Sequence, residues 1–283
     1  MRARVPASSA NLGPGYDALA LALGLHLEVT VEPSSHLEVS AEGEGAQLDK
    51  GPEHPAVRVA RRVLGHDSFS LHVASEIPLA RGLGSSAALA VAAAAAAGAD
   101  DPLSVGAGVD GHPENAAASV LGGLVAASLV AGRPLARRLP LDPGLGFVLL
   151  LPELELETER ARAVLPESVP LAQAAHNLGR MGLLLAGLAD RRLLVSEAGD
   201  DLLHQPWRTR LFPEAPELLD RLRRAGAVVA TWSGAGPSLL GICADRSLAA
   251  RVAKEGERAL EQAGVAGRAL VAEADLEGLV VRA

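Results

Sequence analysis

The segment from Pro78 to Ala88 constrains this chain most, because glycines and small polar residues stand there between an expected strand and an expected helix. It reads Pro-Leu-Ala-Arg-Gly-Leu-Gly-Ser-Ser-Ala-Ala. The residues from Phe69 to Ile77 predict a strand that ends at Pro78, and the alanines after Ser85 predict a helix. Glycines let the backbone approach an anion closely, and the free N–H groups at a helix start favour negative charge. The segment therefore indicates a phosphate-binding loop.

Other nucleotide-binding motifs fit this segment less well. A P-loop ends in Gly-Lys-Ser/Thr, and the two lysines of the chain, Lys50 and Lys254, lie outside the segment. A dinucleotide fingerprint matches loosely as Gly82-x-Gly84-x-x-Ala87, but no second strand ends in an acidic residue about 20 residues further on. A plain strand-to-helix turn remains an alternative for the segment taken alone.

Length, charge and cysteine content limit the classes of protein to consider. The 283 residues suffice for one large domain or two ordinary ones, with 49% hydrophobic and 21% charged residues. A net charge of −8 argues against a nucleic-acid partner, which requires a cationic face. The stretch from Ala87 to Ala97 is too short to span a membrane, and no signal-peptide core follows the first residues. With Cys243 as the one cysteine, we expect no intrachain disulfide, no membrane partner and a cytoplasmic location.

Hydrophobic patterning predicts interleaved strands and helices. The alternation from Leu25 to Glu32 predicts a half-buried strand, and Leu37 to Ala41 follows a turn as its expected hairpin partner. Further strands are expected at 69–77, 147–151, 227–231, 239–243 and 268–272, and helices at 55–64, from 85 through the alanines, 171–188, 217–224 and 247–263. This mixture indicates an α+β fold, which we divide into residues 1–148 and 149–283.

Two further segments combine with the glycine loop into a recognisable set. Residues 5–17 read Val-Pro-Ala-Ser-Ser-Ala-Asn-Leu-Gly-Pro-Gly-Tyr-Asp, and residues 231–238 read Thr-Trp-Ser-Gly-Ala-Gly-Pro-Ser. With residues 78–88, they resemble the three motifs of the GHMP kinases, in the family's order and across nearly the whole chain. That group includes galactokinase, homoserine kinase, mevalonate kinase and phosphomevalonate kinase, and residues 5–17 resemble the homoserine-kinase version of the first motif.

This resemblance implies a fold, a phosphoryl donor and a metal ion. The fold would be the two-domain α+β GHMP architecture, with a ferredoxin-like C-terminal domain and with ATP between the domains. Magnesium would bridge the terminal phosphates and contact Ser86. Homodimers are common in the family, although nothing local in the sequence decides this point. The residues that the resemblance places at ATP are Leu79, Ala80, Arg81, Gly82, Leu83, Gly84, Ser85, Ser86, Ala87 and Ala88.

The resemblance also implies a site for homoserine, a zwitterionic amino acid with a terminal hydroxyl. Arginine suits a carboxylate because the planar guanidinium can pair with it bidentately. Residues 158–166 resemble the family segment Ser-Thr-x-x-Ala-Arg-x-x-Leu-Pro, and residues 111–115, Gly-His-Pro-Glu-Asn, resemble its Gly-His-Pro-Asp-Asn. The resemblance implies that Asp17 binds the ammonium and that His112 and Asn115 lie at the reacting hydroxyl. The substrate-binding residues that it implies are Asn11, Asp17, Thr158, Arg162, Arg208 and Gly236.

One expected residue has no counterpart. The family usually has a magnesium-binding glutamate about two helical turns before its histidine, and Ser104 falls near that place here. Asp110 is the nearest acidic substitute. Asn115 stands where related kinases have a carboxylate, and an asparagine is not a base. Two alternatives to a homoserine kinase therefore remain open: a GHMP kinase for another small molecule, and a nucleotide-binding regulator that has lost catalysis. A hydrolase is disfavoured, because neither Gly-x-Ser-x-Gly nor His-Glu-x-x-His occurs.

Overall fold

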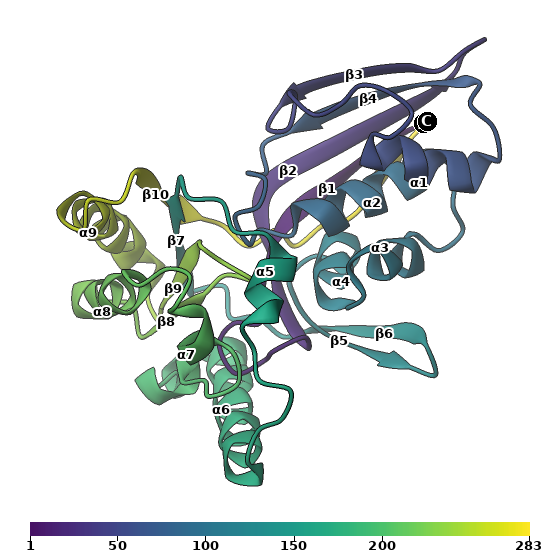
Figure 1. Cartoon of the computed structure of the whole chain (residues 1–283). Helices are drawn as coiled ribbons and strands as arrows, with labels where there is room; N and C mark the ends of the chain where they lie inside the picture. The colour runs from purple at the N-terminus through teal and green to yellow at the C-terminus, as the bar shows by residue number, and fades with distance from the viewer.

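The long strand β2 (Leu19–Pro33) organises the first sheet, because three other strands pair with it (Figure 1). The structure is a computed structural model that describes all 283 residues. The sheet order is β11-β1-β2-β4-β3, and a hairpin of β5 and β6 continues from the start of β2. The other strands of this sheet are β1 (Arg2–Ala10), β3 (Glu38–Gly43), β4 (Phe69–Ser75), β5 (Leu124–Val130), β6 (Arg133–Leu139) and β11 (Val280–Arg282).

The predicted hairpin between β2 and β3 is wrong. Strand β4 occupies the edge of β2 in antiparallel pairing, and β3 pairs in parallel with β4. A parallel pair requires a long crossover, and α1 (Pro55–Leu64) lies in the connection between β3 and β4. After β2 the chain therefore forms the outer strand β3, and β4 later inserts between β3 and β2. Strand β1, which carries the first half of the N-terminal motif, was not among the predicted strands.

The alanine-rich helix α2 (Ser85–Ala96) is buried on nearly every side. It packs against β1, β2, α1, α3 (Pro102–Asp110) and α4 (Glu114–Leu121). A helix that is apolar all round belongs inside a protein, and the small alanine side chains let its neighbours approach closely. These four helices form one layer against the first sheet (Figure 1). The predicted strand–loop–helix unit at 69–97 is confirmed.

The second sheet has four antiparallel strands in the order β10-β7-β9-β8. In chain order this is 4-1-3-2, the arrangement expected of a ferredoxin-like domain, and it confirms the predicted fold class. Helices α8 and α9 pack against this sheet and against each other. The elements are β7 (Gly146–Pro152), α5 (Thr158–Ala163), α6 (Leu171–Ala189), α7 (Gln205–Arg208), α8 (Ala215–Ala225), β8 (Val229–Trp232), β9 (Leu239–Cys243), α9 (Ala249–Gln262) and β10 (Gly267–Ala272), with short 3₁₀ turns at Arg191–Leu193, Ser196–Gly199 and Arg246–Leu248.

The chain passes between the two halves twice, once before β7 and again before β11. Strand β7 begins at Gly146, before the expected division at 148/149, and β11 returns the C-terminal segment to the edge of β1. One buried core includes Leu21 and Val91 from the first half together with Leu149 and Leu184 from the second. None of the helices combines the length and the apolar composition needed to cross a bilayer.

Candidate active site

The glycine loop, residues 78–88, enters α2 through two left-handed glycines. Gly82 has a φ of +70° and Gly84 a φ of +67°, and Gly84 is the N-cap of α2 without a side-chain cap. A Cβ on Gly82 would lie 2.1 Å from the carbonyl oxygen of Ser233, and one on Gly84 would lie 2.1 Å from Oγ of Ser8. The loop is therefore held between β1 and the turn after β8 at a distance that only glycine allows.

The first N–H groups of α2 are available to an anion. The N–H of Ala88 donates to the carbonyl of Gly84, which leaves those of Ser85, Ser86 and Ala87 without an acceptor in the helix. They carry the positive end of the helix dipole, and the uncapped glycine leaves room for a ligand oxygen in place of a capping side chain. This arrangement suits a phosphate group.

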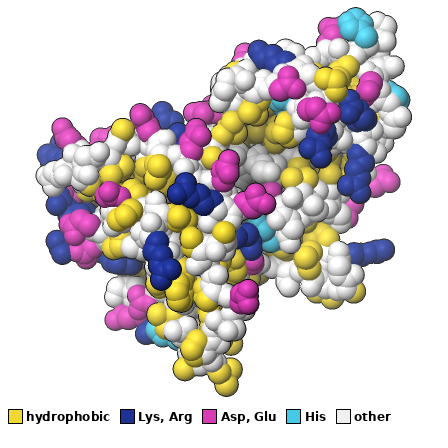
Figure 2. All heavy atoms as spheres, viewed as in Figure 1, with side chains coloured by type: hydrophobic (Ala, Val, Ile, Leu, Met, Phe, Trp, Pro, Cys, Tyr) yellow, Lys and Arg dark blue, Asp and Glu magenta, His cyan; other side chains and the backbone are white.

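Two cavities meet at this loop. The smaller lies between the two halves of the chain and is lined mainly by polar residues. The larger lies beside α2 and is lined mainly by apolar residues. Ala80, Ser85 and Ser86 line both. Figure 2 shows acidic, basic and histidine side chains gathered where the two halves meet. The apolar residues of the larger cavity include Leu48, Val59, Leu79, Leu89, Val105 and Val109.

Arg162 and Asp17 face each other across the smaller cavity. Arg162 lies on α5, and its Nη2 donates to Oδ1 of Asp17 over 2.6 Å. Both side chains are about one-third exposed, at 35% and 32%. Asp17 has a φ of +53°, a strained conformation that Asn11 supports by accepting the N–H of Asp17 over 3.0 Å. The cavity thus presents one cation and one anion, the complement of a zwitterion.

Arg208 is the most deeply buried arginine of the site. It is 2% exposed, forms no ion pair, and its Nε has no partner in the protein. Its Nη1 donates to the carbonyl of Gly234 over 2.7 Å and to Nδ1 of His204 over 3.0 Å. Burial lowers the pKa of Arg208 to about 10, which leaves it charged at neutral pH. A buried cation without an anion is unfavourable unless a ligand supplies one.

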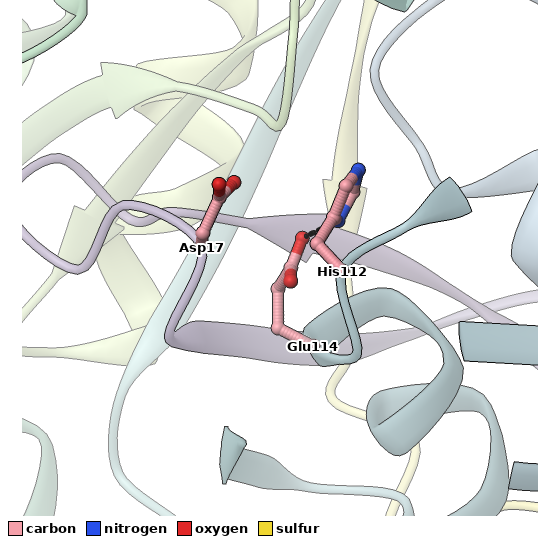
Figure 3. A group of neighbouring side chains, drawn as sticks. All are labelled: Asp17, His112 and Glu114. Atoms are coloured by element: carbon pink, nitrogen blue, oxygen red, sulfur yellow. Dashed lines mark hydrogen bonds and ion pairs between the residues drawn. The ribbon is translucent and has the colours of Figure 1, made fainter. Parts of the chain in front are cut away.

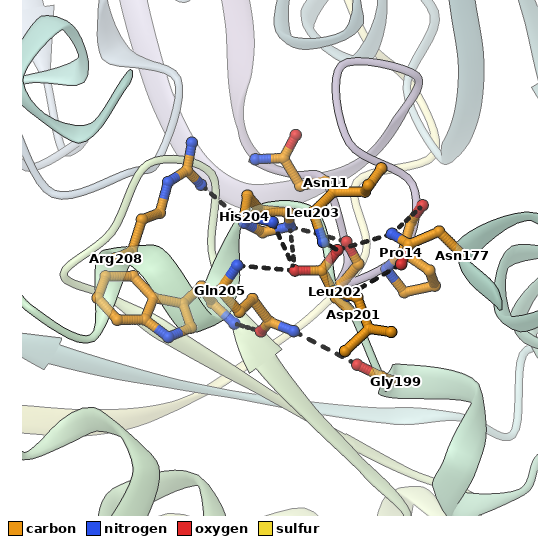
Figure 4. Close-up of polar contacts among 12 residues, drawn as sticks. Asn11, Pro14, Asn177, Gly199, Asp201, Leu202, Leu203, His204, Gln205 and Arg208 are labelled. Atoms are coloured by element: carbon orange, nitrogen blue, oxygen red, sulfur yellow. Dashed lines mark hydrogen bonds and ion pairs between the residues drawn. The ribbon is translucent and has the colours of Figure 1, made fainter. Parts of the chain in front are cut away.

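A buried polar network holds Arg208 in place (Figure 4). Nε2 of His204 lies 2.8 Å from the carbonyl oxygen of Gly13, which can only accept, so Nδ1 is the acceptor for Arg208. Asp201 accepts the N–H groups of residues 203, 204 and 205 and the side-chain amide of Asn177. The network joins the N-terminal motif loop to α6 and α7, so it fixes the position of Arg208 relative to Asp17.

His112, Glu114 and Asn115 form the opposite wall. Nδ1 of His112 lies 2.6 Å from Oε1 of Glu114, and the carboxylate of Asp17 lies near this pair (Figure 3). Burial alone would lower the pKa of His112. The hydrogen bond and the negative charge of Glu114 outweigh burial, so the pKa is raised. Asn115 donates to Glu114 and accepts from Oγ of Ser8 over 2.8 Å. A Cβ on Gly84 would lie 2.9 Å from Oδ1 of Asn115, so the Asn115 amide packs against the glycine that begins α2.

Ser86 and Asp110 form the candidate metal position. Asp110 is the last residue of α3 and lines the smaller cavity together with Ser86. Burial raises the pKa of Asp110, because no cation of the protein neutralises it fully. A hydroxyl and a carboxylate are hard oxygen donors of the kind that magnesium takes. Ser104, by contrast, bonds to Asp101 at the exposed start of α3.

The Asp17, His112 and Glu114 group fits magnesium less well. Its ligand atoms lie within 4.8 Å of one another, but it includes an imidazole nitrogen. Asp17 is already paired with Arg162 and Glu114 with His112. The imidazole donates to Glu114, so only the two carboxylates are left as acceptors for a cationic ligand.

Most of the predicted residues come together, and a few do not. The smaller cavity is lined by Asn11, Asp17, Ala80, Gly82, Leu83, Gly84, Ser85, Ser86, His112, Asn115, Thr158, Arg162 and Arg208, and Leu79 lines the larger one. The Asn11 amide is engaged on both sides, by Asp17 and Gly234, so it positions the loop.

Four predicted residues do not line either cavity. Arg81 donates to the carbonyl of Pro152 and anchors the loop to β7. Ala87 and Ala88 have fully buried side chains in the core, although the Ala87 N–H stays available. Gly236 packs against the Trp232 ring, and Gly234 and Ala235 of the same motif line the cavity instead.

Some residues of the site escaped the sequence reasoning. The sequence motifs assign no role to Glu114, Tyr16 or His204, although all three lie at the site. Glu114 is 1% exposed and His204 is fully buried. Hydrophobic periodicity does not reveal which polar residues are buried. Only their position within the motifs could indicate Glu114 and Tyr16.

Known proteins resemble this chain over most of its length. Residues 53–123 match the family described as GHMP kinases N terminal domain, and residues 171–262 match GHMP kinases C terminal. A homoserine kinase of Moorella thermoacetica is 39% identical over 274 residues, covering 89% of this chain and 93% of the relative. A homoserine kinase of Thermus thermophilus is 42% identical over 250 residues, covering 84% of this chain and 85% of the relative.

Solved structures agree in fold. A homoserine kinase of Cytophaga hutchinsonii superposes with a TM-score of 0.87 at 24% identity, covering 100% of this chain and 97% of that one. A putative homoserine kinase of Listeria monocytogenes gives 0.78 at 26% identity, covering 100% and 99%. The two matched regions together with relatives at 39% and 42% identity show that this chain belongs to the GHMP kinase family.

Proposed function

We propose that this protein is a homoserine kinase, which transfers the γ-phosphoryl group of ATP to the hydroxyl of L-homoserine and forms O-phospho-L-homoserine and ADP. The observation that carries the proposal is the buried, unpaired guanidinium of Arg208 opposite the Arg162–Asp17 pair. Two guanidinium groups suit a carboxylate, and Asp17 suits an ammonium. The relatives named homoserine kinase support the same substrate. We assign the reaction to threonine biosynthesis in the cytoplasm.

The proposed placement of ATP follows from the two cavities. The open N–H groups of Ser85, Ser86 and Ala87 bind the phosphates, and the nucleoside extends into the larger cavity along α2. That cavity is built from residues 48–109 alone, so the nucleoside lies within the first half of the chain, whereas the phosphates reach the junction. Arg58 and Arg62 line its rim and could pair with the α-phosphate or stack on the base.

The proposed reaction depends on alignment more than on a strong base, because the transition state of phosphoryl transfer is loose. Asn115, held by Ser8 and Glu114, orients the substrate hydroxyl for in-line attack on the γ-phosphorus. The bond from that phosphorus to the bridging oxygen of ADP breaks as the new one forms, and the hydroxyl proton leaves late, to a phosphate oxygen. Bound magnesium would be held by Ser86 and Asp110 and would neutralise the charge on the terminal phosphates.

The proposal is tested by following ADP release with a panel of homoserine, mevalonate, galactose and shikimate in the presence of magnesium and ATP. We expect turnover with homoserine at least 100-fold above the other three, since none of them has an ammonium for Asp17. Turnover of another member would establish a different GHMP kinase. ATP binding without any turnover would establish the regulator instead.

Asp110→Asn is expected to raise the magnesium concentration needed for half-maximal activity. A hydrogen bond to a charged oxygen contributes about 1.5–3 kcal/mol, which corresponds to roughly 10- to 150-fold. The measurement is a magnesium titration of homoserine phosphorylation at saturating ATP. Asp101→Asn is the matched control, because Asp101 caps the other end of α3 and is exposed. An unchanged requirement in Asp110→Asn would remove Asp110 from the metal site.

A further inference from the structure

The single tyrosine of the chain lies between the two arginines of the proposed substrate site. Tyr16 follows β1 in the N-terminal motif loop and is partly buried. Its ring centroid is 5.5 Å from Cζ of Arg162 and 5.8 Å from Cζ of Arg208, both within the range of a cation–π contact. The His204 ring lies 5.3 Å from it in a tilted arrangement. Tyr16 thus contacts both guanidinium groups and the network behind them.

The Tyr16 hydroxyl holds one of these arginines directly. Nη1 of Arg162 donates to Oη of Tyr16 over 2.9 Å, while Nη2 donates to Asp17 over 2.6 Å. These are the only hydrogen bonds that the Arg162 side chain forms within the protein. Burial raises the pKa of Tyr16, so the phenol stays neutral at physiological pH and does not become a competing anion for Arg162.

An incoming zwitterion changes these contacts in a defined way. In the structure, the cation and the anion proposed to bind the substrate are paired with each other. A substrate with its own carboxylate and ammonium can replace that pair by two, carboxylate with Arg162 and ammonium with Asp17. Once Nη2 leaves Asp17, the bond to Tyr16 is the one hydrogen bond that the protein keeps with the guanidinium.

We propose that Tyr16 is a positioning residue for the substrate carboxylate: its hydroxyl retains Arg162 during this exchange, and its ring holds Arg162 and Arg208 at a fixed separation. Tyr16 does not itself line the cavity, so it acts through the arginines. The electron-rich ring also offsets the mutual repulsion of the two guanidinium groups, which would otherwise drive the more exposed Arg162 toward solvent. The inference rests on the proposed homoserine kinase activity.

The test is a double-mutant cycle of Tyr16→Phe and Arg162→Ala, measured as KM for homoserine, KM for ATP and kcat. We expect Tyr16→Phe to raise the homoserine KM about 10-fold, the loss of one hydrogen bond to a charged group, with kcat and the ATP KM unchanged. In the Arg162→Ala background the same substitution should change the homoserine KM by less than about 2-fold, because its target is gone. Tyr16→Leu, which also removes the ring, should raise KM further by disturbing Arg208.

Each outcome decides the matter. A wild-type homoserine KM in Tyr16→Phe overturns the inference, and so does an equal effect in the presence and absence of Arg162, since that would mean a general effect on the fold. Parallel increases in the homoserine and ATP KM values overturn it too. Failure of the wild-type protein to phosphorylate homoserine would instead overturn the proposed function. Thermal melting of each variant confirms that the comparison is between folded proteins.

Discussion

Arg208→Met is expected to lower kcat/KM for homoserine by about 100- to 1000-fold. Methionine keeps much of the side-chain volume but removes the charge, so the substrate carboxylate loses a desolvated partner. Truncating one member of a buried charge pair commonly costs more than about 2 kcal/mol, and a water-excluded site strengthens the loss. The loss is expected mainly in the homoserine KM, with the ATP KM within about 2-fold of wild type.

Arg210→Met is the matched control for this experiment. Arg210 lies two residues further on, is exposed, and stacks on the Trp207 ring instead of entering the cavity. It should retain wild-type kinetics. Arg162→Ala should fall between the two, because Arg162 is about one-third exposed and water partly replaces it. An Arg208→Met enzyme with an ordinary homoserine KM and an intact melting temperature would refute the assignment of the substrate carboxylate to Arg208.

The sequence could predict the chemical parts of the site but not their contacts. The strand, glycine loop and helix at 69–97 were foreseeable because local patterns determine them. Asp17 and Arg162 are 145 residues apart in the chain, and no local pattern reveals that they pair. Which loops meet is determined by how the two sheets dock, a tertiary property.

The metal position shows why spacing along the chain was a poor guide. Counting back from His112 pointed to Ser104, which bonds to Asp101 at the exposed start of α3. The end of α3 is the part that meets the glycine loop, because Gly111 ends the helix in a left-handed conformation at φ +80°. Asp110, one residue earlier, lines the same cavity as Ser86. The same limitation explains β3, whose alternation predicted a strand but could not select β4 as its partner.

Acid is expected to destabilise this protein through His204. Burial lowers the pKa of His204 to about 4, and the neighbouring charge of Arg208 acts in the same direction against an opposing effect of Asp201. In the unfolded chain the pKa of His204 is near 6.5. Between that pH and the folded-state value, His204 is protonated in the unfolded state but neutral in the folded state. The stability contributed by neutral His204 is therefore complete above about pH 6.5 and is lost as the pH falls toward 4. Between pH 7.5 and 4.5 the loss should be on the order of 2–3 kcal/mol.

Urea unfolding of wild type and His204→Asn across this pH range measures the effect. Relative to the variant, the wild type should lose on the order of 2–3 kcal/mol of unfolding free energy on acidification, because asparagine has no proton to bind in the unfolded state. His66→Asn is the control, since His66 is exposed and its removal should leave the pH dependence of the wild type unchanged. Parallel curves for wild type and His204→Asn would mean that the buried imidazole takes up its proton as readily as in the unfolded chain. In that case burial and the charge of Arg208 would not disfavour the imidazolium, and His204 would not be the origin of the acid sensitivity.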